Sequence, residues 1–572
     1  MKKSHLCYLL LTITIISLLL PLSVCAEDEA VLPSGLSYGE LGAALDAFLE
    51  EHGDNNAAVA VAVFDGKDDL YSRSFGFIDT GKSVPLDENC VLEWGSTTKL
   101  TVWLSIIQLV SDGKLDLDAD VRGYLPEGFL KNLHYDEPIT VLNLMNHNAG
   151  FEETDFVLEV TDTEDIIPLG EYLAKYQPNQ YFRPGEVVAY SNWGAALAGY
   201  VVECVSGMSF SDYAQQNIFK PLEMNDTAIA ADLSDNPSVA ERRKNFVTYL
   251  PDGTLSTENN KVYILPYPAG MCTSTLADFA TFAKALLNRD SRLLSEDYFD
   301  LLYSPSLYYT DTDIPRLFHG FLIDYDFAVP VLGHDGNTLG GSSRLMLDFE
   351  NGVGMVVFCN QLGGSLYRTK MAEKVFGTAE YHYDLDGHYM PARSIFSGSS
   401  KIYYNLFLYN ACHFTSEMVD GMYINPIGDR FEISTCDYLL MGPWYAVRDV
   451  LTAAWIACAV YCLITALVRL TILIVVKAKK KPHDGKNTLA LAYGAFLSLP
   501  LILLLGAIPS IIGFIYMILL AAFSVFYAAG IKKKDGMAPT LTKLDLAQKI
   551  SLLLCAAVTL ANLIIWDMIV FW

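Results

Sequence analysis

The chain has 572 residues, more than a single hydrophobic core usually serves, so we expect at least two structural units. Its formal net charge of −27 and its pI of about 4.7 argue against nucleic acid and against an anionic membrane surface as partners. A hydrophobic fraction of 52% and a mean hydropathy of +0.27 are too high for an entirely soluble protein, and the apolar excess lies at the two ends.

Residues 1–26 have the pattern of a secretory signal peptide. Two lysines precede an apolar run that ends at Leu20, and small residues precede a predicted cleavage site after Ala26. Two alternatives stay open for this segment, namely a lipoprotein signal with Cys25 as the lipidated residue and an uncleaved anchor helix. The signal-peptide interpretation predicts that the chain is exported.

The next part, residues 27–378, has the pattern of an α+β domain. An apolar run over 58–64 ends in an Asp-Gly-Lys turn and predicts a buried strand, and a second strand follows as its hairpin partner. Helical patterns cover 96–111 and dominate 140–290, and alternating strand patterns return near 344–359. We therefore expect terminal strands to form one antiparallel sheet, flanked by a large helical region.

The start of the helix predicted over 96–111 holds the first candidate catalytic pair. Ser96 opens this helix, where its hydroxyl meets the positive end of the helix dipole, and Lys99 lies one turn later on the same face. A hydroxyl is a weak nucleophile unless a neighbouring base removes its proton. The plain alternative is a helix cap without chemistry. A second Ser-x-x-Lys pattern begins at Ser111, but its glycine marks a helix end, where the dipole opposes a nucleophile.

Two further motifs follow in the chain. The sequence Tyr-Ser-Asn at 190–192 lies between a turn and a predicted helix, and His-Asp-Gly at 334–336 lies shortly before a Gly-Gly pair and a strand. With Ser-x-x-Lys at 96–99, this order resembles the serine β-lactamase and penicillin-binding protein (D,D-peptidase) family, in the class C β-lactamase-like branch, whose third motif is K-T-G or H-x-G. The resemblance covers roughly residues 35–375 and implies a β-lactamase/transpeptidase-like fold.

The resemblance also implies a role for each matched position. Ser96 would attack a carbonyl and carry the acyl group, while Lys99 and Tyr190 would share its proton. Asn192 would hold the substrate amide. The backbone N–H groups of Ser96 and Asn337 would form an oxyanion hole, which places hydrogen-bond donors where negative charge develops.

The third motif departs from the common lysine pattern, which bears on the substrate. His334 has an ordinary pKa near 6.5 and is mostly neutral at pH 7 unless a carboxylate such as Asp335 holds its proton. Together with Gly336 it would line the substrate site, with weaker carboxylate recognition than a lysine gives. Within the family, the H-x-G motif resembles members that act on esters or D-amino-acid peptides, so the resemblance favours these substrates over efficient β-lactam hydrolysis. Arg344 could replace the missing charge or be a solvated edge residue, and His147 is interpreted as structural.

The C-terminal part consists of two segments that differ in sequence pattern from the preceding domain and from each other. Residues 379–443 alternate turn signals with aromatic residues and predict a small β-rich extension. Residues 444–572 predict a membrane region with four helices at about 450–476, 488–508, 510–530 and 549–571. Lysine clusters follow the first and third helices, and such clusters face the cytoplasm. The sequence therefore predicts a multi-pass protein of the cell membrane whose hydrolase domain lies outside the cytoplasm.

The combined interpretation is a membrane-anchored serine hydrolase that acts on amide or ester bonds of a small-molecule or peptide substrate, such as a peptidoglycan fragment. No cofactor and no metal ion is expected, because the cysteines lack metal-ligand spacing, although Cys412 and Cys436 could pair as a disulfide. The lipid bilayer is an expected partner, and the sequence identifies no protein partner. Two alternatives are a sensor of β-lactams or wall fragments that signals through its membrane helices, and a scaffold with a decayed site.

Overall fold

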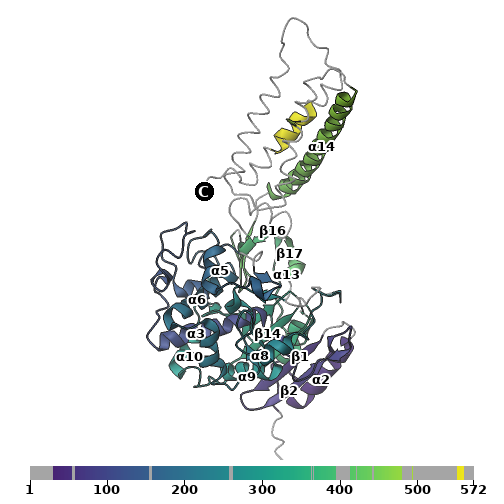
Figure 1. The fold of residues 1–572 in the computed structure, drawn as a ribbon. Helices are drawn as coiled ribbons and strands as arrows, with labels where there is room; N and C mark the ends of the chain where they lie inside the picture. Colours follow the sequence, from purple (N-terminus) through teal and green to yellow (C-terminus); the bar gives the residue numbers. More distant parts are fainter. Residues whose placement is uncertain are drawn as a thin grey trace, which may run out of the picture.

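The computed structural model describes residues 30–53, 58–153, 158–250, 252–256, 262–339, 341–361, 364, 366–394, 412–419, 422–428, 430–440, 444–479, 492–493 and 550–559. Along the chain these residues form an α+β body, a small β module and a long apolar helix (Figure 1). The predicted signal segment, residues 1–26, lies outside the described residues.

An antiparallel sheet of eight strands, in the order β10-β11-β12-β13-β14-β15-β1-β2, forms the centre of the body. Its strands are β1 (Val59–Asp65), β2 (Asp69–Phe75), β10 (Leu307–Tyr308), β11 (Pro315–Phe318), β12 (Phe321–Asp324), β13 (Val331–Asn337), β14 (Ser342–Asp348) and β15 (Val353–Cys359). The first strand pairs with the last, since β1 lies between β2 and β15. This arrangement confirms the prediction of one sheet built from both ends of the domain.

Helices cover both faces of this sheet (Figure 1). They are α2 (Tyr38–Glu51), α3 (Lys99–Ser111), α4 (Val141–Met145), α5 (Leu169–Lys175), α6 (Asn192–Ser206), α7 (Phe210–Ala214), α8 (Pro237–Arg243), α9 (Leu276–Leu287), α10 (Glu296–Leu302) and α11 (Glu373–Phe376). One apolar core joins α2 and α11 to the sheet, and a larger core joins the opposite face to α3, α6 and α9. Because β1 and β15 are buried on both faces, their sequences read as nearly continuous apolar runs.

Short strands complete the body and support the nucleophile segment. They are β3 (Phe77–Asp79), β4 (Val84–Pro85), β5 (Leu92–Glu93), β6 (Glu159–Val160), β7 (Thr227–Ala228), β8 (Tyr263–Ile264) and β9 (Thr273–Ser274). The strand β9 pairs with both β5 and β7, and β5 leads directly into the turn that carries Ser96.

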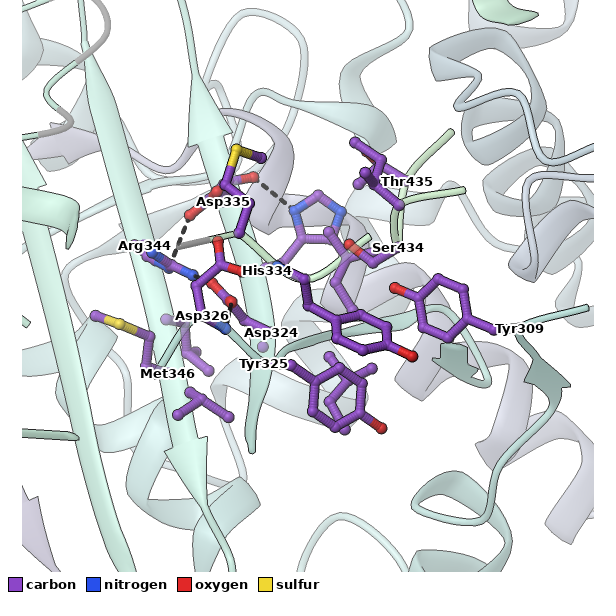
Figure 2. A pocket seen from close by; sticks show the side chains of 18 residues that line it. Tyr309, Asp324, Tyr325, Asp326, His334, Asp335, Arg344, Met346, Ser434 and Thr435 are labelled. Atoms are coloured by element: carbon purple, nitrogen blue, oxygen red, sulfur yellow. Dashed lines mark hydrogen bonds and ion pairs between the residues drawn. The ribbon is translucent and has the colours of Figure 1, made fainter. Parts of the chain in front are cut away.

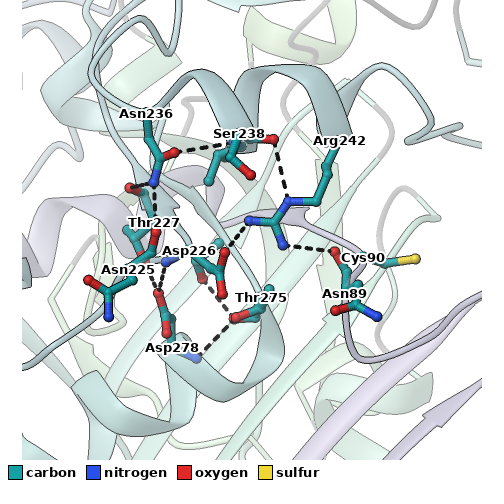
Figure 3. A network of polar contacts seen from close by, with 12 residues as sticks. Asn89, Cys90, Asn225, Asp226, Thr227, Asn236, Ser238, Arg242, Thr275 and Asp278 are labelled. Atoms are coloured by element: carbon teal, nitrogen blue, oxygen red, sulfur yellow. Dashed lines mark hydrogen bonds and ion pairs between the residues drawn. The ribbon is translucent and has the colours of Figure 1, made fainter.

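A polar network fixes these short strands to the helices (Figure 3). The carboxylate of Asp278 on α9 accepts hydrogen bonds from the backbone N–H of Asp226 at 2.8 Å and from the hydroxyl of Thr227 at 2.7 Å. The side chain of Arg242 on α8 pairs with the Asp226 carboxylate and donates to the carbonyl of Asn89 at 3.1 Å. The network thus joins α8, α9, β7 and the loop before β5, so the segment leading to Ser96 is held from several sides.

The small β module is a second sheet, with strand order β17-β16-β20-β19-β18. Its elements are β16 (Asp386–Pro391), β17 (Cys412–Thr415), α13 (Ser416–Val419), β18 (Asn425–Ile427), β19 (Arg430–Glu432) and β20 (Asp437–Leu440). It has its own apolar core, to which Tyr389 and Phe431 contribute. Cys436 is a buried free thiol that donates to the carbonyl of Asp437 at 3.3 Å, so it does not form the disulfide considered with Cys412.

The helix α14 (Trp444–Ala478) follows the module and extends away from the body (Figure 1). Its stretch Ala454–Ala478 has 25 residues and a mean hydropathy of 2.5, enough in length and composition to cross a membrane. A shorter apolar helix, Ile550–Thr559, falls within the fourth predicted span. The second and third predicted spans lie outside the described residues apart from 492–493, so the four-helix region stays a prediction.

Candidate active site

The candidate nucleophile Ser96 lies in a 3-10 turn, Gly95–Thr98, that continues directly into α3. It therefore precedes the α-helix by part of a turn and does not cap it as expected, because the helical conformation already begins within the 3-10 turn. Gly95 has φ +52°, and a Cβ at this position would lie 2.6 Å from the backbone nitrogen of Asn337. Only glycine fits this contact, which brings the Ser96 turn against the end of β13.

Lys99 is fully buried and makes three short hydrogen bonds. Its Nζ lies 2.9 Å from Oγ of Ser96, 2.7 Å from Oδ1 of Asn192 and 2.7 Å from the carbonyl oxygen of Ala269. Two of these partners are oxygens that only accept, whereas the serine hydroxyl can also donate. As an ammonium, Lys99 donates to all three oxygens; as a neutral amine it keeps two N–H donors for Asn192 and Ala269 and turns its lone pair to the Ser96 hydroxyl. The arrangement thus allows a proton to move between Oγ and Nζ without rearrangement.

The second motif places Tyr190 and Asn192 against this pair. The hydroxyl of Ser191 caps α6 by accepting from the N–H of Gly194 at 2.9 Å, which fixes Asn192 as the first residue of the helix. The Tyr190 ring lies 4.9 Å from Nζ of Lys99. The two predicted motifs therefore meet, although the spacing of some ninety residues in the chain gave no sign of the geometry.

The third motif packs its backbone against the nucleophile turn. A Cβ on Gly336 would lie 1.8 Å from the carbonyl oxygen of Trp94, so a side chain here would separate β13 from the turn. The hydroxyl of Thr97 donates to the carbonyl of His334 at 3.2 Å. Together with the approach of Gly95 to Asn337, these contacts place the end of β13 beside Ser96. All seven predicted site residues thus lie in or against one region.

His334 is buried, with 4% of its surface exposed, and its ring centre lies 6.0 Å from that of Tyr190. Burial, followed by the positive charge of Lys99, lowers the pKa of His334 to about 4, so the ring is neutral at pH 7. Its Nδ1 lies 2.5 Å from the backbone carbonyl of Asp335, which assigns the proton to Nδ1. The other nitrogen, Nε2, is buried without a hydrogen-bond partner in the described structure.

Two possibilities raised by the sequence for the charge beside His334 do not occur in this structure. The carboxylate of Asp335 does not hold the histidine proton, because successive side chains of a strand point to opposite faces. It pairs instead with Nε of Arg344 at 3.0 Å, across the β13–β14 ladder. Arg344 also pairs with Asp324 and is buried, so it is neither a solvated edge residue nor a free charge for the substrate.

His147 matches its structural interpretation. It has φ +52°, and its Nδ1 accepts from the backbone N–H of Ser191 at 3.3 Å. Burial, followed by the charge of Lys99, lowers the pKa of His147 well below its ordinary value. The ring packs against Tyr190 with centres 4.4 Å apart. It therefore orients the second motif.

The sequence analysis missed two charged residues at this site. Glu153 is buried and accepts from the backbone N–H of Asn192 at 3.1 Å. Arg393 comes from the 3-10 turn Ala392–Ser394 of the β module, lies 3.3 Å from the Glu153 carboxylate and places its guanidinium 5.2 Å from the centre of the Tyr190 ring. Glu153 and Arg393 are 240 positions apart, and no spacing rule joins them.

A loop of the β module reinforces this contact. Cys436 forms a β-bridge with Ala189, and the backbone N–H of Asp437 donates to the carbonyl of Val188 at 2.9 Å. The loop thus adds a strand-like edge to the segment that precedes Tyr190. The module is therefore part of the environment of the candidate site.

A cavity of about 200 Å³ lies between β12, β13 and the module. Figure 2 shows the His334 ring in it, between Asp335 and Ser434. Its other walls include three tyrosines and two further carboxylates: Tyr309, Tyr325, Tyr423, Asp324 and Asp326. His334 thus lies both beside Tyr190 and in the wall of this cavity.

The low pKa of His334 predicts a specific dependence of stability on pH. Above pH 6.5 the ring is neutral in both the folded and the unfolded chain, and protonation of His334 does not lower the free energy of unfolding. Between pH 6.5 and about 4 only the unfolded chain takes up the proton, so the free energy of unfolding falls by about 3 kcal/mol. We expect His334→Gln to remove this fall in the free energy of unfolding, which chemical denaturation measures at several pH values. The matched change His382→Gln, at an exposed histidine, should leave the fall unaltered.

Comparison with known proteins gives the family. Residues 45–380 match the family model described as Beta-lactamase. Penicillin-binding protein 4* of Bacillus subtilis (strain 168) is 28% identical over 294 residues, 49% of this chain and 60% of that protein, so the chain spans less than two thirds of that relative. Penicillin-binding protein 4 of Amycolatopsis lactamdurans is 28% identical over 346 residues, which cover 58% of this chain and 87% of that protein.

Among solved structures, D-amino acid amidase from Ochrobactrum anthropi SV3, complexed with D-phenylalanine, is 22% identical with a TM-score of 0.49, covering 59% of this chain and 97% of that one. The octameric penicillin-binding protein homologue from Pyrococcus abyssi is 20% identical with a TM-score of 0.47, covering 69% and 87%. The family model spans more than half of the sequence. The chain therefore belongs to the β-lactamase family of serine hydrolases.

Proposed function

We propose that this protein is an extracytoplasmic, membrane-anchored hydrolase in which Ser96 forms an acyl-enzyme with an amide or ester substrate. One observation carries the proposal: Nζ of Lys99 lies 2.9 Å from the Ser96 hydroxyl, while Asn192 and Ala269 take up two of its N–H donors. A buried amine held in this way is a base for a serine nucleophile.

The reaction proceeds in two proton-balanced steps. Oγ of Ser96 attacks the carbonyl carbon while its proton passes to Lys99, and Tyr190 delivers a proton to the leaving amine or alcohol as the tetrahedral intermediate collapses. In the second step the Tyr190 phenolate takes a proton from water, which attacks the acyl carbon. Lys99 returns its proton to Oγ of Ser96 as the acyl bond breaks, so both groups regain their starting states. The backbone N–H groups of Ser96 and Asn337 stabilise the oxyanion in both steps, which the contact of Gly95 with Asn337 supports.

The surrounding residues set the substrate class. We propose that Asn192 binds the substrate amide and that His334 and Gly336 line its path, as in the class C-like branch with an H-x-G motif. The neutral His334 supports an ester or a D-amino-acid peptide as substrate over a β-lactam, because it offers no positive charge to a substrate carboxylate. Arg393 provides a fixed positive charge at the site, since its guanidinium faces Tyr190 and Glu153.

The proposal includes the position of the enzyme in the cell. We assign 1–26 to a signal peptide, 27–378 to the hydrolase domain, 379–443 to the β module and 444–572 to a multi-pass membrane region. The apolar stretch Ala454–Ala478 supports one span, and the lysine clusters of the sequence support the outside location of the hydrolase domain.

Covalent labelling of the full chain in detergent tests the nucleophile. We expect a fluorescent penicillin or a general serine-hydrolase probe to label the wild-type protein and the Ser111→Ala variant, and to leave Ser96→Ala unlabelled. Ser111 is a matched control because it opens the second Ser-x-x-Lys pattern, at the C-terminal end of α3. Equal labelling of Ser96→Ala, or no labelling of folded wild type, contradicts the proposal. An adduct that persists for hours without turnover instead supports the sensor alternative.

A further inference from the structure

The cavity between the hydrolase domain and the β module has walls from two structural units. Strands β12 and β13 provide one side, and residues 422–423 with 433–435 of the module provide the other. Ligand sites often form at such junctions, where a concave surface is lined by aromatic groups and a few polar ones. The charges of this cavity therefore indicate which ligand it fits.

The carboxylates in the wall outnumber the cations. Arg344 pairs with both Asp324 and Asp335, which leaves Asp326 without an ion-pair partner among the described residues. The Asp326 carboxylate accepts a hydrogen bond from the backbone N–H of Tyr423 at 2.7 Å. Burial, followed by the neighbouring charge of Asp324, raises the pKa of Asp326 to about 7. A positive charge brought into the cavity would restore the ionised form of this group.

The other groups in the wall also favour a cation. The rings of Tyr309 and Tyr325 pack against Tyr423 with centres 5.1 and 5.0 Å from it and give the cavity an aromatic side. His334 also borders the cavity, and its neutral ring adds no positive charge there. A carboxylate without an ion pair among the described residues, in an aromatic wall, is complementary to a group that is positively charged and donates N–H bonds.

The chemistry of the wall favours an organic cation over a metal ion. Within the described residues, no group of three or more His, Cys, Asp and Glu side chains converges as a metal site would require. A cavity of about 200 Å³ has room for an ammonium group with part of its carbon skeleton. A protonated primary amine has three N–H donors that point in different directions, which suits acceptors spread over the wall of the cavity.

We propose that this cavity is a subsite for a protonated amine of the substrate, with Asp326 as its counter-charge. The inference rests on the proposed hydrolase function, because His334 borders both the cavity and the ring of Tyr190. It names the substrate class more closely: an amide or ester that carries a free amino group. The β module is then a determinant of specificity.

Equilibrium binding tests the subsite independently of catalysis. The full-length Ser96→Ala protein in detergent is titrated with benzylamine and with benzyl alcohol, which have nearly the same shape and differ in charge. We expect benzylamine to bind at least tenfold more tightly than the alcohol. The variant Asp326→Asn should lose this difference, because it keeps the acceptor for Tyr423 and removes only the charge. The control Asp297→Asn, an exposed carboxylate on α10, should retain it.

Kinetics then separate the subsite from the proposed reaction. With a D-amino-acid ester and its N-acetyl derivative as substrates, we expect wild type to prefer the free amine about tenfold in kcat/KM, chiefly through KM. Asp326→Asn should remove the preference and leave turnover of the N-acetyl ester unchanged within twofold. Equal binding of amine and alcohol by the Ser96→Ala protein overturns the subsite, whatever the kinetics. Selective amine binding without turnover of either ester contradicts the hydrolase and leaves the subsite standing.

Discussion

Replacing Lys99 with methionine is expected to lower the rate of acylation by roughly 10³-fold, within the range that one positioned general base contributes. Methionine keeps much of the side-chain volume and removes the amine, so the proton of Ser96 loses its acceptor 2.9 Å away. The rate is measured as formation of the covalent adduct with a fluorescent penicillin or a serine-hydrolase probe under single-turnover conditions.

The control for this prediction lies just beyond the C-terminal end of the same helix. Lys114→Met changes the lysine of the second Ser-x-x-Lys pattern, which is exposed and pairs with Asp112, and its rate should stay within twofold of wild type. Lys99→Met also leaves Asn192 and the Ala269 carbonyl without their buried donor, a cost of about 1–3 kcal/mol for each group. Thermal unfolding must therefore show that the variant is folded. A loss of less than tenfold in folded protein would remove Lys99 as the base.

Replacing Arg316 with methionine is expected to destabilise the junction between the hydrolase domain and the β module by about 3–5 kcal/mol. This side chain of β11 is 3% exposed and lies 2.6 Å from the carboxylate of Asp437 and 3.7 Å from that of Glu432. Its Nε donates to the carbonyl of Ile433 at 2.9 Å. Without the guanidinium, two carboxylates that are 1–2% exposed stay in the interface with less compensation.

The matched control for Arg316 is Arg430, because it approaches the same two carboxylates. Its distances are longer, 3.4 Å to each, and its side chain is 24% exposed, so Arg430→Met should cost below about 1 kcal/mol. Chemical denaturation followed by tryptophan fluorescence gives both values. Equal effects of the two substitutions would show that burial does not decide the strength of this junction.

The sequence was sufficient for the main features of the fold. The apolar runs of β1 and β15 predict buried strands, and their pairing places the two ends of the domain side by side. The motifs could be located because each is a short segment whose neighbours in the chain fix its geometry. Ser96 and Lys99 lie on one turn, and Tyr190 and Asn192 flank the cap of α6.

The errors concern side chains whose environment comes from distant segments. Successive side chains of a β-strand point to opposite faces of the sheet. This rule alone predicts that the Asp335 carboxylate lies on the face opposite to His334. The ion pairs of Arg344 were not predictable, because Asp324 lies on another strand and nothing local indicates the register. Glu153 and Arg393 were missed for the same reason. Burial of a charge pair depends on how the module packs, which no local pattern encodes.

The attachment of Arg393 and the 433–437 loop to the segment before Tyr190 has a temporal meaning. A ribosome releases Ser96 and Lys99 about 300 residues before it releases Arg393, and domains fold in that order during synthesis. In a nascent chain, Ser96 and Lys99 are therefore already present while Arg393, whose guanidinium lies near the Tyr190 ring, is still missing. Residues 433–437, close before α14, complete the contacts with the segment before Tyr190, so these contacts form only after the β module has been made. The surroundings of Tyr190 are therefore completed late in the synthesis of the chain.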